Sequence, residues 1–305
     1  MQIQKVALLG AGAVGAYFIW GLAEKLGDNF CVIAKGERKE RLEREGLIIN
    51  GQPYTFSVKE PTQVDGVDLL LVSSKQDGLV EALEDIKTIV DANTIVISLL
   101  NGVTSEEIIG NAIGMEHVLY SVMRIASIRE GNHITFSPES TAGVFVGEKG
   151  ISAPTERILA LKAFFENTDI RFHFVEDIVL DMWTKYASNI SQNLPQAILG
   201  VGFGAYIDSV HVNHIAACLW REVAQVANAK GIPFDHELLL FRGSNFKARF
   251  STLQDIDAGR HTEIDMFTGE MMRMAAELNI PVPYCEYTYH LIKALEEKND
   301  NKFDY

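Results

Sequence analysis

A glycine-rich turn near the start of the chain constrains the fold more than any other feature. The sequence Gly10-Ala11-Gly12-Ala13-Val14-Gly15 follows a short apolar run at 3–9 and opens a helical pattern at 13–26. In a strand–turn–helix unit, the first glycine permits the tight turn, the second lets the backbone approach a pyrophosphate, and the third lets helix and strand pack closely. The turn therefore predicts a dinucleotide-binding site, with an ordinary glycine-rich turn as the alternative.

Strand and helix patterns alternate over the first half of the chain. Further apolar strand patterns lie at 30–34, 68–72, 94–99, 118–122, 143–147 and 171–175, with helical patterns at 37–45, 77–86, 104–109 and 155–167. This alternation is typical of a doubly wound parallel sheet with helices on both faces. After residue 175 only helical patterns follow, at 178–193, 211–230, 260–279 and 284–297. We expect a Rossmann-type α/β domain at 1–177 and an all-α domain at 178–305.

The charge balance limits the partners. The 305 residues include 41 acidic and 27 basic side chains, a formal net charge of −14, which argues against nucleic acid or an anionic membrane as partner. Any positive charge that binds an anionic small molecule must therefore be local. The apolar stretch at 6–23 imitates a membrane anchor, but glycines interrupt it and no convincing cleavage site follows.

The cysteines bear on the compartment. Cys31, Cys218 and Cys285 are widely separated and form no CxxC pair. Such spacing is typical of a reducing compartment rather than of a disulfide framework or a zinc site. We therefore expect a cytoplasmic protein without a metal centre.

The residues after the second strand bear on the choice of cofactor. An NAD site places an Asp or Glu there to bind the ribose hydroxyls, whereas this chain continues with Lys35 and Arg38. Their positive charges can face the 2′-phosphate of NADP(H), which would repel an acid. We expect NADP(H), although both residues also fit a solvated helix and Glu37 keeps the NAD alternative open.

Polar side chains recur every fourth residue on the first helix of the second half. At roughly 100° per residue, Lys185, Asn189 and Asn193 share one face of a helix. A solvent-exposed face is the alternative, but asparagine is a poor helix former. A lysine can protonate a carbonyl oxygen while neutral amides hold the substrate.

Two further polar groups occur elsewhere in the chain. Ser251 with Gln254 has the spacing of a capping box, and Glu263 with Asp265 could be ordinary first-turn acids of a helix. Asn101, like Lys75 earlier, directly follows a predicted strand, at the sheet edge where ligands of open α/β sheets bind. A simple Asn-Gly turn at 101–102 is the alternative.

These motifs together resemble the ketopantoate reductase (2-dehydropantoate 2-reductase) family, in the right order and over nearly the whole chain. The resemblance rests on the glycine turn, Ser74-Lys75-Gln76, Leu100-Asn101-Gly102, Trp183-Thr184-Lys185-Tyr186-Ala187-Ser188-Asn189 and the block from Ser251 to Asp265. The lysine–asparagine helix and that last block are far more specific than the glycine turn.

The resemblance implies NADPH-dependent reduction of a 2-oxo acid to a 2-hydroxy acid, in a cleft between a Rossmann domain and a helical domain like that of 6-phosphogluconate dehydrogenase. Lys185 would be the general acid, and Glu263 would position substrate and cofactor. The remaining carried-over roles are substrate binding by Asn189, Asn193 and Ser251, and binding of the cofactor and the reacting end of the ligand by Lys75 and Asn101. Fold analogy also suggests a homodimer.

The chain departs from the family pattern at two places. Typical members carry a further asparagine in the loop after the lysine helix, where this chain has Gly200-Val201-Gly202-Phe203, and another before the serine, where it has Ala248. Fewer polar contacts to the far end of the substrate would follow. Three alternatives to ketopantoate reduction therefore stay open: reduction of a different 2-oxo acid, a related 3-hydroxy acid or polyol phosphate dehydrogenase, and a non-catalytic NADP-binding sensor.

Overall fold

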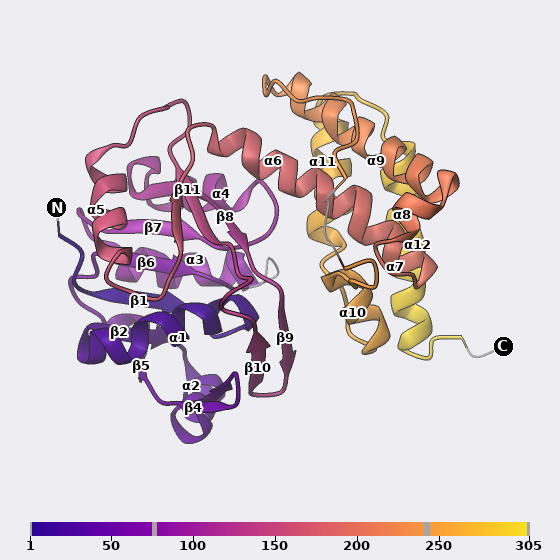
Figure 1. Ribbon diagram of the computed structural model, residues 1–305. Coiled ribbons are helices and arrows are strands. Elements are labelled where there is room, and N and C mark those ends of the chain that lie inside the picture. Colours follow the sequence, from indigo (N-terminus) through magenta and orange to yellow (C-terminus); the bar gives the residue numbers. More distant parts are fainter. Residues whose placement is uncertain (1, 75–77, 241–244, 304–305) are drawn as a thin grey trace. The chain divides into compact units, whose positions relative to one another are not determined.

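The chain folds into two compact units, Met1–Asp181 and Met182–Tyr305. The computed structural model describes residues 2–74, 78–240 and 245–303 (Figure 1). The domain boundary expected after residue 177 falls at the start of helix α6, Ile178–Ser188, whose first turn belongs to the first unit.

An eight-stranded sheet forms the centre of the first unit, in the order β12-β11-β8-β7-β6-β1-β2-β5. The strands are β1 (Val6–Leu9), β2 (Phe30–Ile33), β5 (Ser57–Lys59), β6 (Leu69–Val72), β7 (Ile95–Ser98), β8 (Val118–Arg124), β11 (Gly143–Gly147) and β12 (Phe172–Phe174). The six strands from β8 to β5 are parallel and carry the strand order of a Rossmann fold. This confirms the predicted doubly wound sheet.

Strand β11 differs from the expected all-parallel arrangement, because it pairs with β8 antiparallel. Between these two strands the chain forms a hairpin rather than a crossover helix. A parallel neighbour would need a long crossover connection, whereas an antiparallel one does not. Strand β12 pairs with β11 in parallel and completes the edge.

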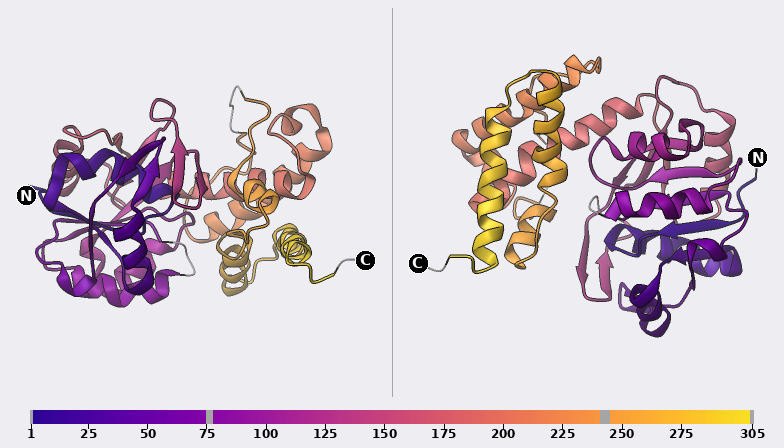
Figure 2. Two further views of the ribbon diagram at one scale, coloured as in Figure 1. Left: turned by 90° about the horizontal axis from the view of Figure 1, so that it is seen from below. Right: turned by 180° about the vertical axis from the view of Figure 1, so that it is seen from behind.

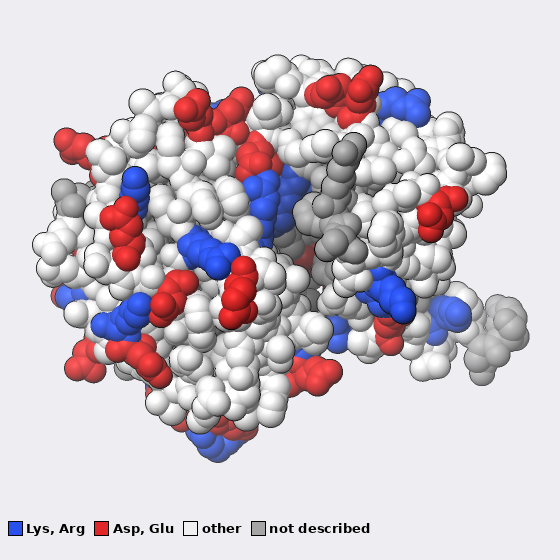
Figure 3. All heavy atoms as spheres, in the orientation of Figure 1, with Lys and Arg blue, Asp and Glu red and all other residues white. Residues whose placement is uncertain are grey.

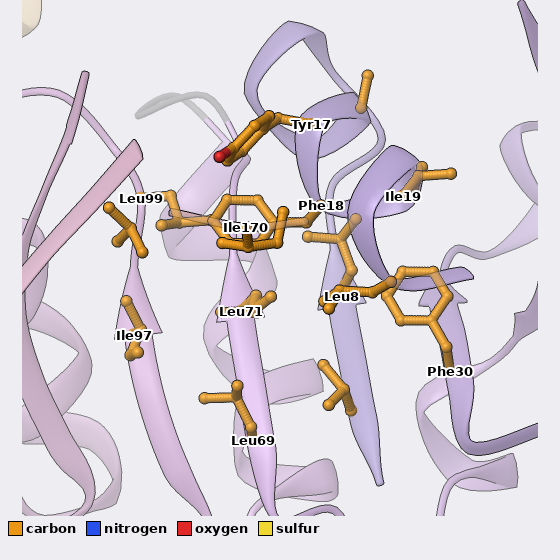
Figure 4. Packing of buried hydrophobic residues seen from close by; sticks show 14 of the residues in the cluster. Leu8, Tyr17, Phe18, Ile19, Phe30, Leu69, Leu71, Ile97, Leu99 and Ile170 are labelled. Carbon is orange, nitrogen blue, oxygen red and sulfur yellow. The ribbon is translucent and has the colours of Figure 1, made fainter. Parts of the chain in front are cut away.

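Helices cover both faces of the sheet, because alternate residues of its short strands are buried on opposite sides. Leu8, Leu71 and Ile97 lie on one face, where Phe18 points onto them from helix α1 (Figure 4). The opposite face includes Ala7 and packs against helices α3 and α4. The helices of this unit are α1 (Ala13–Leu26), α2 (Gly36–Glu45), α3 (Leu79–Ile89), α4 (Ser105–Ile113) and α5 (Glu156–Phe165), with 3₁₀ turns η1 (Gly27–Asn29), η2 (Pro61–Gln63) and η4 (Met115–His117).

A second, four-stranded sheet in the first unit was not predicted. Its order is β4-β3-β10-β9, from β3 (Leu47–Ile49), β4 (Gln52–Tyr54), β9 (Ser127–Glu130) and β10 (His133–Phe136). These strands are short, and apart from the apolar β3 they lack the apolar runs that marked the central strands, since several of them are largely exposed. Strand β9 contacts helix α1, which brings the β9–β10 hairpin beside the helix that follows the glycine turn.

The second unit is helical, as predicted. Its elements are α6 (Ile178–Ser188), η5 (Asn189–Asn193), α7 (Leu194–Leu199), α8 (Ala205–Asp208), α9 (Val210–Ala229), α10 (Ser251–Asp257), η6 (Asp265–Gly269), α11 (Glu270–Glu277) and α12 (Pro283–Asn299), where η5 and η6 are π-helices. Helix α12, drawn in yellow, runs beside α11 (Figure 2, right). The continuous helix expected at 260–279 is wrong, since residues 260–264 are not helical and η6 precedes α11. Among the described residues, no helix combines the length and the apolar character of a membrane span.

Candidate functional site

The glycines of the turn differ in the space that surrounds them. Gly10 has φ +109°, and a Cβ there would lie 2.7 Å from the Ser73 carbonyl carbon; a Cβ on Gly15 would lie 2.1 Å from the Gly10 oxygen. These two glycines are required by the packing of the turn itself. At Gly12 the nearest described atom to an added Cβ would be Arg129 Nη1, at 3.9 Å. The protein leaves room at Gly12, where the motif requires a close approach of backbone and pyrophosphate.

The start of helix α1 fits an anionic ligand. Gly12 is its N-cap, and the first turn contains no acidic residue, so the free N–H groups carry an uncompensated partial positive charge. Nearby, the Ser73 hydroxyl donates a hydrogen bond to the Gly10 oxygen at 2.5 Å. Ser74 Oγ is buried and has no hydrogen-bond partner in the described part of the chain. An unsatisfied buried hydroxyl beside the glycine turn is what a bound dinucleotide can satisfy.

The positive charge near the end of β2 is distributed differently from expectation. Lys35 Nζ forms an ion pair with Asp85 Oδ1 on α3 at 2.7 Å. Arg38 and Arg41, one turn apart on α2, form no ion pair with any described residue. Partial burial and repulsion by Arg41 lower the pKa of Arg38. Among these three basic residues, Lys35 forms an ion pair, whereas Arg38 and Arg41 form none in the described part of the chain.

Elsewhere on the surface of the first unit, basic side chains lie next to acidic ones, so positive charge without a neighbouring acid is confined to small areas. On the face in Figure 3, acidic and basic side chains lie next to one another over much of this unit. Pairs such as Lys87 with Glu84, at 2.7 Å, illustrate the matching. A chain of net charge −14 can thus still present a small basic cluster.

Asn101 follows strand β7 and is half-buried, in the loop that leads to α4. The expected contribution of Lys75 lies outside the described residues. Below the Asn101 loop, the Ser98 and Ser105 hydroxyls lie 2.7 Å apart, and Ser105 donates to Glu106 Oε2 at 2.9 Å. Burial raises the pKa of Glu106 to about 7. This carboxyl was not predicted, because nothing in the sequence pattern marks the first-turn acid of α4 as buried.

The helix that carries Lys185, Asn189 and Asn193 changes from an α-helix to a π-helix at the two asparagines. Helix α6 ends at Ser188, and the π-helix η5 holds Asn189 and Asn193 at its two ends. Asn193 Nδ2 donates a hydrogen bond to Asn189 Oδ1 at 3.2 Å, so these two side chains do lie together. Lys185 is half-buried one turn earlier. Single π-turns inside α-helices occur frequently at functional sites.

Tyr186 connects the lysine helix to the segment that carries Glu263. Its buried hydroxyl donates to the carbonyl oxygens of Phe267, at 2.6 Å, and Met266, at 3.3 Å, in η6. The backbone N–H groups of the same two residues donate to the Glu263 carbonyl, both at 3.1 Å. The residue next to Lys185 is thereby tied to the turn that begins at Glu263. Tyr186 had no role in the sequence analysis beyond the motif that contains it.

The Glu263 segment is also anchored to helix α12. Thr262 donates through its N–H and its hydroxyl to Glu296 Oε1, each at 2.7 Å. Asp265 accepts hydrogen bonds from Tyr289, at 2.7 Å, and Lys293, at 3.0 Å. Partial burial acts to raise the pKa of Asp265, but these hydrogen bonds outweigh it and lower the pKa. Asp265 thus anchors the segment in which the half-buried Glu263 lies.

Ser251 is not the helix cap that its spacing predicts. The N-cap of α10 is Phe250, and the Gln254 side chain donates to the Arg249 oxygen at 2.7 Å, so the capping-box interpretation is wrong. The Phe250 N–H donates to Gln196 Oε1 at 2.6 Å. Helix α10 packs against α7 and η5, and Ser251, its first residue, is exposed.

The two departures from the family pattern lie against each other. The Phe203 N–H donates to the Ala248 oxygen at 3.1 Å, and the Gly204 N–H donates to the Phe246 oxygen at 2.8 Å. A Cβ on Gly202 would lie 2.6 Å from that same Phe246 oxygen, so the close pairing requires glycine there. The Phe203 side chain is buried in a cluster that Ala248 and Phe250 also join. Apolar groups thus occupy the loop at 200–203 and position 248, the two places where the resemblance leads us to expect an asparagine.

The first unit, with its glycine turn, and the second, with its lysine–asparagine helix, define a two-unit nicotinamide-dependent oxidoreductase. The chain belongs to the ketopantoate reductase family. The model of the ketopantoate reductase PanE/ApbA family matches residues 6–147, and that of its C-terminal part matches 177–296. A 2-dehydropantoate 2-reductase of Pyrococcus horikoshii is 30% identical, and the match covers 96% of this chain and 97% of the relative.

Solved structures of similar fold cover nearly the whole chain. A PanE/ApbA family ketopantoate reductase from Ralstonia eutropha has a TM-score of 0.82 and 26% identity, covering 97% of this chain and 100% of that one. A D-mandelate dehydrogenase with NADH and anilino(oxo)acetate has a TM-score of 0.81 and 23% identity, covering 97% and 99%. A ketopantoate reductase from Staphylococcus aureus, described as dimeric, has a TM-score of 0.76 and 17% identity, covering 97% and 99%.

Proposed function

We propose that this protein is a cytoplasmic, NADPH-dependent 2-dehydropantoate 2-reductase, which reduces ketopantoate to pantoate for the synthesis of pantothenate and coenzyme A. The observation that carries the proposal is the hydrogen-bonded pair Asn189 and Asn193 in the π-turn directly after Lys185. Family membership and the fit of the glycine turn to a dinucleotide support it. We also infer a homodimer, which the description of the Staphylococcus aureus relative supports.

Binding of the cofactor falls to the first unit. The N–H groups that begin α1 bind the pyrophosphate beside Gly12. The ligand also offers an acceptor to the Ser74 hydroxyl, which has no partner among the described residues. Asn101 and Lys75 hold the nicotinamide end and the reacting end of the substrate. The chemistry that bound NADPH supplies is the hydride for the carbonyl carbon.

Lys185 acts as the general acid. As the carbonyl carbon gains a hydride, negative charge develops on the carbonyl oxygen, and the Lys185 ammonium donates a proton to that oxygen. The products are a 2-hydroxy acid and oxidised cofactor, and Lys185 regains its proton from solvent. A compact cation is suited to this step, since it stabilises developing charge as a point donor.

The neutral side chains orient the substrate. Asn189, Asn193 and Ser251 supply amide and hydroxyl donors for the carboxylate and hydroxyl groups of ketopantoate, and Glu263 positions the substrate and cofactor. Because Asn193 Nδ2 already donates to Asn189 Oδ1, each amide fixes the orientation of the other. Preorganised donors of this kind hold a substrate in reacting geometry at little entropic cost.

A second candidate substrate is a 2-oxo acid with an apolar far end. Phe203 and Ala248 are joined through their backbone, and their apolar side chains stand where the resemblance leads us to expect polar ones, on the same helical unit as Lys185. Ketopantoate carries a hydroxyl at its far end, whereas a branched-chain or aromatic 2-oxo acid does not. The D-mandelate dehydrogenase of similar fold favours testing aromatic 2-oxo acids as well.

The test is oxidation of NADPH, followed by absorbance, with ketopantoate, pyruvate, a branched-chain 2-oxo acid and phenylglyoxylate as substrates. We expect the largest kcat/KM for ketopantoate. A larger value for an apolar 2-oxo acid would favour the second candidate, and Ala248→Asn should then move the preference back toward ketopantoate. Reduction of NADP⁺ by a 3-hydroxy acid or a polyol phosphate, without NADPH oxidation by any of the 2-oxo acids, would assign the related dehydrogenase class. Tight NADPH binding without any turnover would indicate a sensor and overturn both proposals.

A further inference from the structure

Arg129 comes from a part of the first unit that no motif marks, and it lies beside the glycine turn. It belongs to β9, in the hairpin that contacts helix α1. Its Nε donates to the Gly131 oxygen at 2.9 Å, and its Nη1 lies 3.4 Å from the Ala11 oxygen. The same Nη1 is the nearest atom, at 3.9 Å, to the position of a Cβ on Gly12. The first contact fixes the guanidinium within the hairpin and the others place it next to the turn.

Arg129 adds to a group of like charges rather than to an ion pair. Within the described part of the chain its guanidinium donates only to carbonyl oxygens, and Arg38 and Arg41 form no ion pair there. Desolvation and the charges of Arg38 and Arg41 lower the pKa of Arg129. Glu37 and Glu40 line the same hollow as Arg38 and Arg41 but form no ion pair with them. The three guanidinium groups repel one another, which costs free energy in the unliganded protein. A bound anion of high charge density would remove that cost.

We propose that Arg129 is a specificity-determining residue, which completes with Arg38 and Arg41 a site for the 2′-phosphate of NADPH. The proposal rests on the proposed cofactor and adds a residue that acts from the hairpin, outside the strand–helix unit of the glycine turn. Guanidinium groups suit this role because their planar donors bind phosphate oxygens in pairs. The β9–β10 hairpin thereby becomes part of the cofactor site.

The 2′-phosphate, and not the pyrophosphate, is the group we assign to Arg129. The pyrophosphate is served by the start of α1, where backbone N–H groups are free. Arg38 and Arg41 lie on the helix that follows β2, next to the strand end at which a Rossmann fold binds the adenosine ribose. Strands β1 and β2 pair Leu9 with Ile33, so the turn at Ala11, which Arg129 contacts, lies beside the strand end from which α2 begins. The charges of Arg38 and Arg41 act on Arg129 at this position.

The test is calorimetric binding of 2′,5′-ADP and of 5′-AMP, which differ in the 2′-phosphate, to the full chain and to Arg129→Gln. We expect the substitution to weaken 2′,5′-ADP about ten-fold and to change 5′-AMP by less than about two-fold. Lys87→Gln removes one positive charge from the same unit, in an ion pair with Glu84, and should change neither affinity. Arg38→Gln should show the same selective loss as Arg129→Gln.

If Arg129→Gln lowers the affinity for both ligands equally, Arg129 binds the 5′-phosphate side. If its affinity for 2′,5′-ADP is unchanged, Arg129 does not contribute to binding the 2′-phosphate. Either result overturns the inference. Because both ligands lack the nicotinamide and no 2-oxo acid is present, the outcome is independent of the substrate. If the wild-type chain binds 5′-AMP as tightly as 2′,5′-ADP, both the NADPH preference and this inference are overturned. The proposed reductase reaction is then tested separately, by turnover with NADH. A thermal melt of Arg129→Gln confirms that the variant is folded.

Discussion

The Tyr186 hydroxyl donates a 2.6 Å hydrogen bond to the Phe267 carbonyl, and this contact joins the lysine helix to the π-turn after Glu263. Burial raises the pKa of Tyr186 well above its ordinary value, so the hydroxyl stays a donor at all working pH values. Lys185 and Glu263 are 78 positions apart in the sequence. The Tyr186 hydrogen bond therefore holds the backbone next to Lys185 against the turn that begins at Glu263.

Tyr186→Phe should weaken this connection without leaving a cavity. We expect a loss of about 1–2 kcal/mol in the free energy of unfolding, because the substitution removes the buried hydrogen bonds that the hydroxyl donates to the Phe267 and Met266 carbonyls. If the bond also aligns the site, kcat for 2-oxo acid reduction should fall several-fold while the Kd of NADPH stays unchanged. Urea unfolding and steady-state kinetics measure the two effects. A stability loss with unchanged kcat would restrict Tyr186 to a structural role.

Lys185→Ala should lower kcat by roughly 10² or more, since it removes the positioned proton donor. The Kd of NADPH should be unchanged, because the glycine turn lies in the other unit. Lys230→Ala is a suitable control, since this exposed lysine lies at the end of α9 in the same helical unit. An unchanged turnover number for Lys185→Ala would remove Lys185 from its proposed role.

Gly12→Ala and Gly15→Ala form a matched pair that separates ligand binding from folding. At Gly12 the backbone φ is −88° and a Cβ has room, so we expect stability within about 1 kcal/mol of the wild type. NADPH binding should weaken at least ten-fold, because the methyl group fills the space that the pyrophosphate needs. Gly15→Ala should unfold at a clearly lower temperature, since its Cβ meets the Gly10 oxygen. Equal effects of both variants on NADPH binding and on melting temperature would contradict this separation.

Local patterns were enough to predict the parts of the fold that depend on near neighbours. The glycine turn and the helix at 13–26 were located because a tight turn and a helix start are specified within a few residues. The pair Asn189 and Asn193 followed from four-residue spacing, even though the structure changes the winding there to a π-turn. Spacing predicts which residues share a face better than it predicts how the backbone is hydrogen-bonded.

Features that depend on distant partners were missed. Ser251 had the spacing of a cap, but the chain before it is held by Gln196, 54 residues away, and Phe250 takes the cap position. Arg129 reaches Ala11 across 118 residues from a short polar strand that no apolar pattern marks. Tertiary contacts of this kind leave no local signal, so only the folded chain brings such residues to the site.

Glu106 offers a prediction about pH, because its carboxyl is buried below the Asn101 loop. Burial raises its folded pKa from 4.5 to about 7, so the folded chain keeps a proton that the unfolded chain releases in this window. Wild-type stability should therefore decline as pH rises from about 4.5 through 7. The side chain of Glu106→Gln cannot ionise. The free energy of unfolding of this variant minus that of the wild type should therefore rise by about 2 kcal/mol from pH 5 to pH 8. Urea unfolding at both pH values measures this shift, and Glu107→Gln, next to it but exposed, should show little of it. A gap between wild type and Glu106→Gln that stays constant with pH would mean that Glu106 ionises normally in the fold.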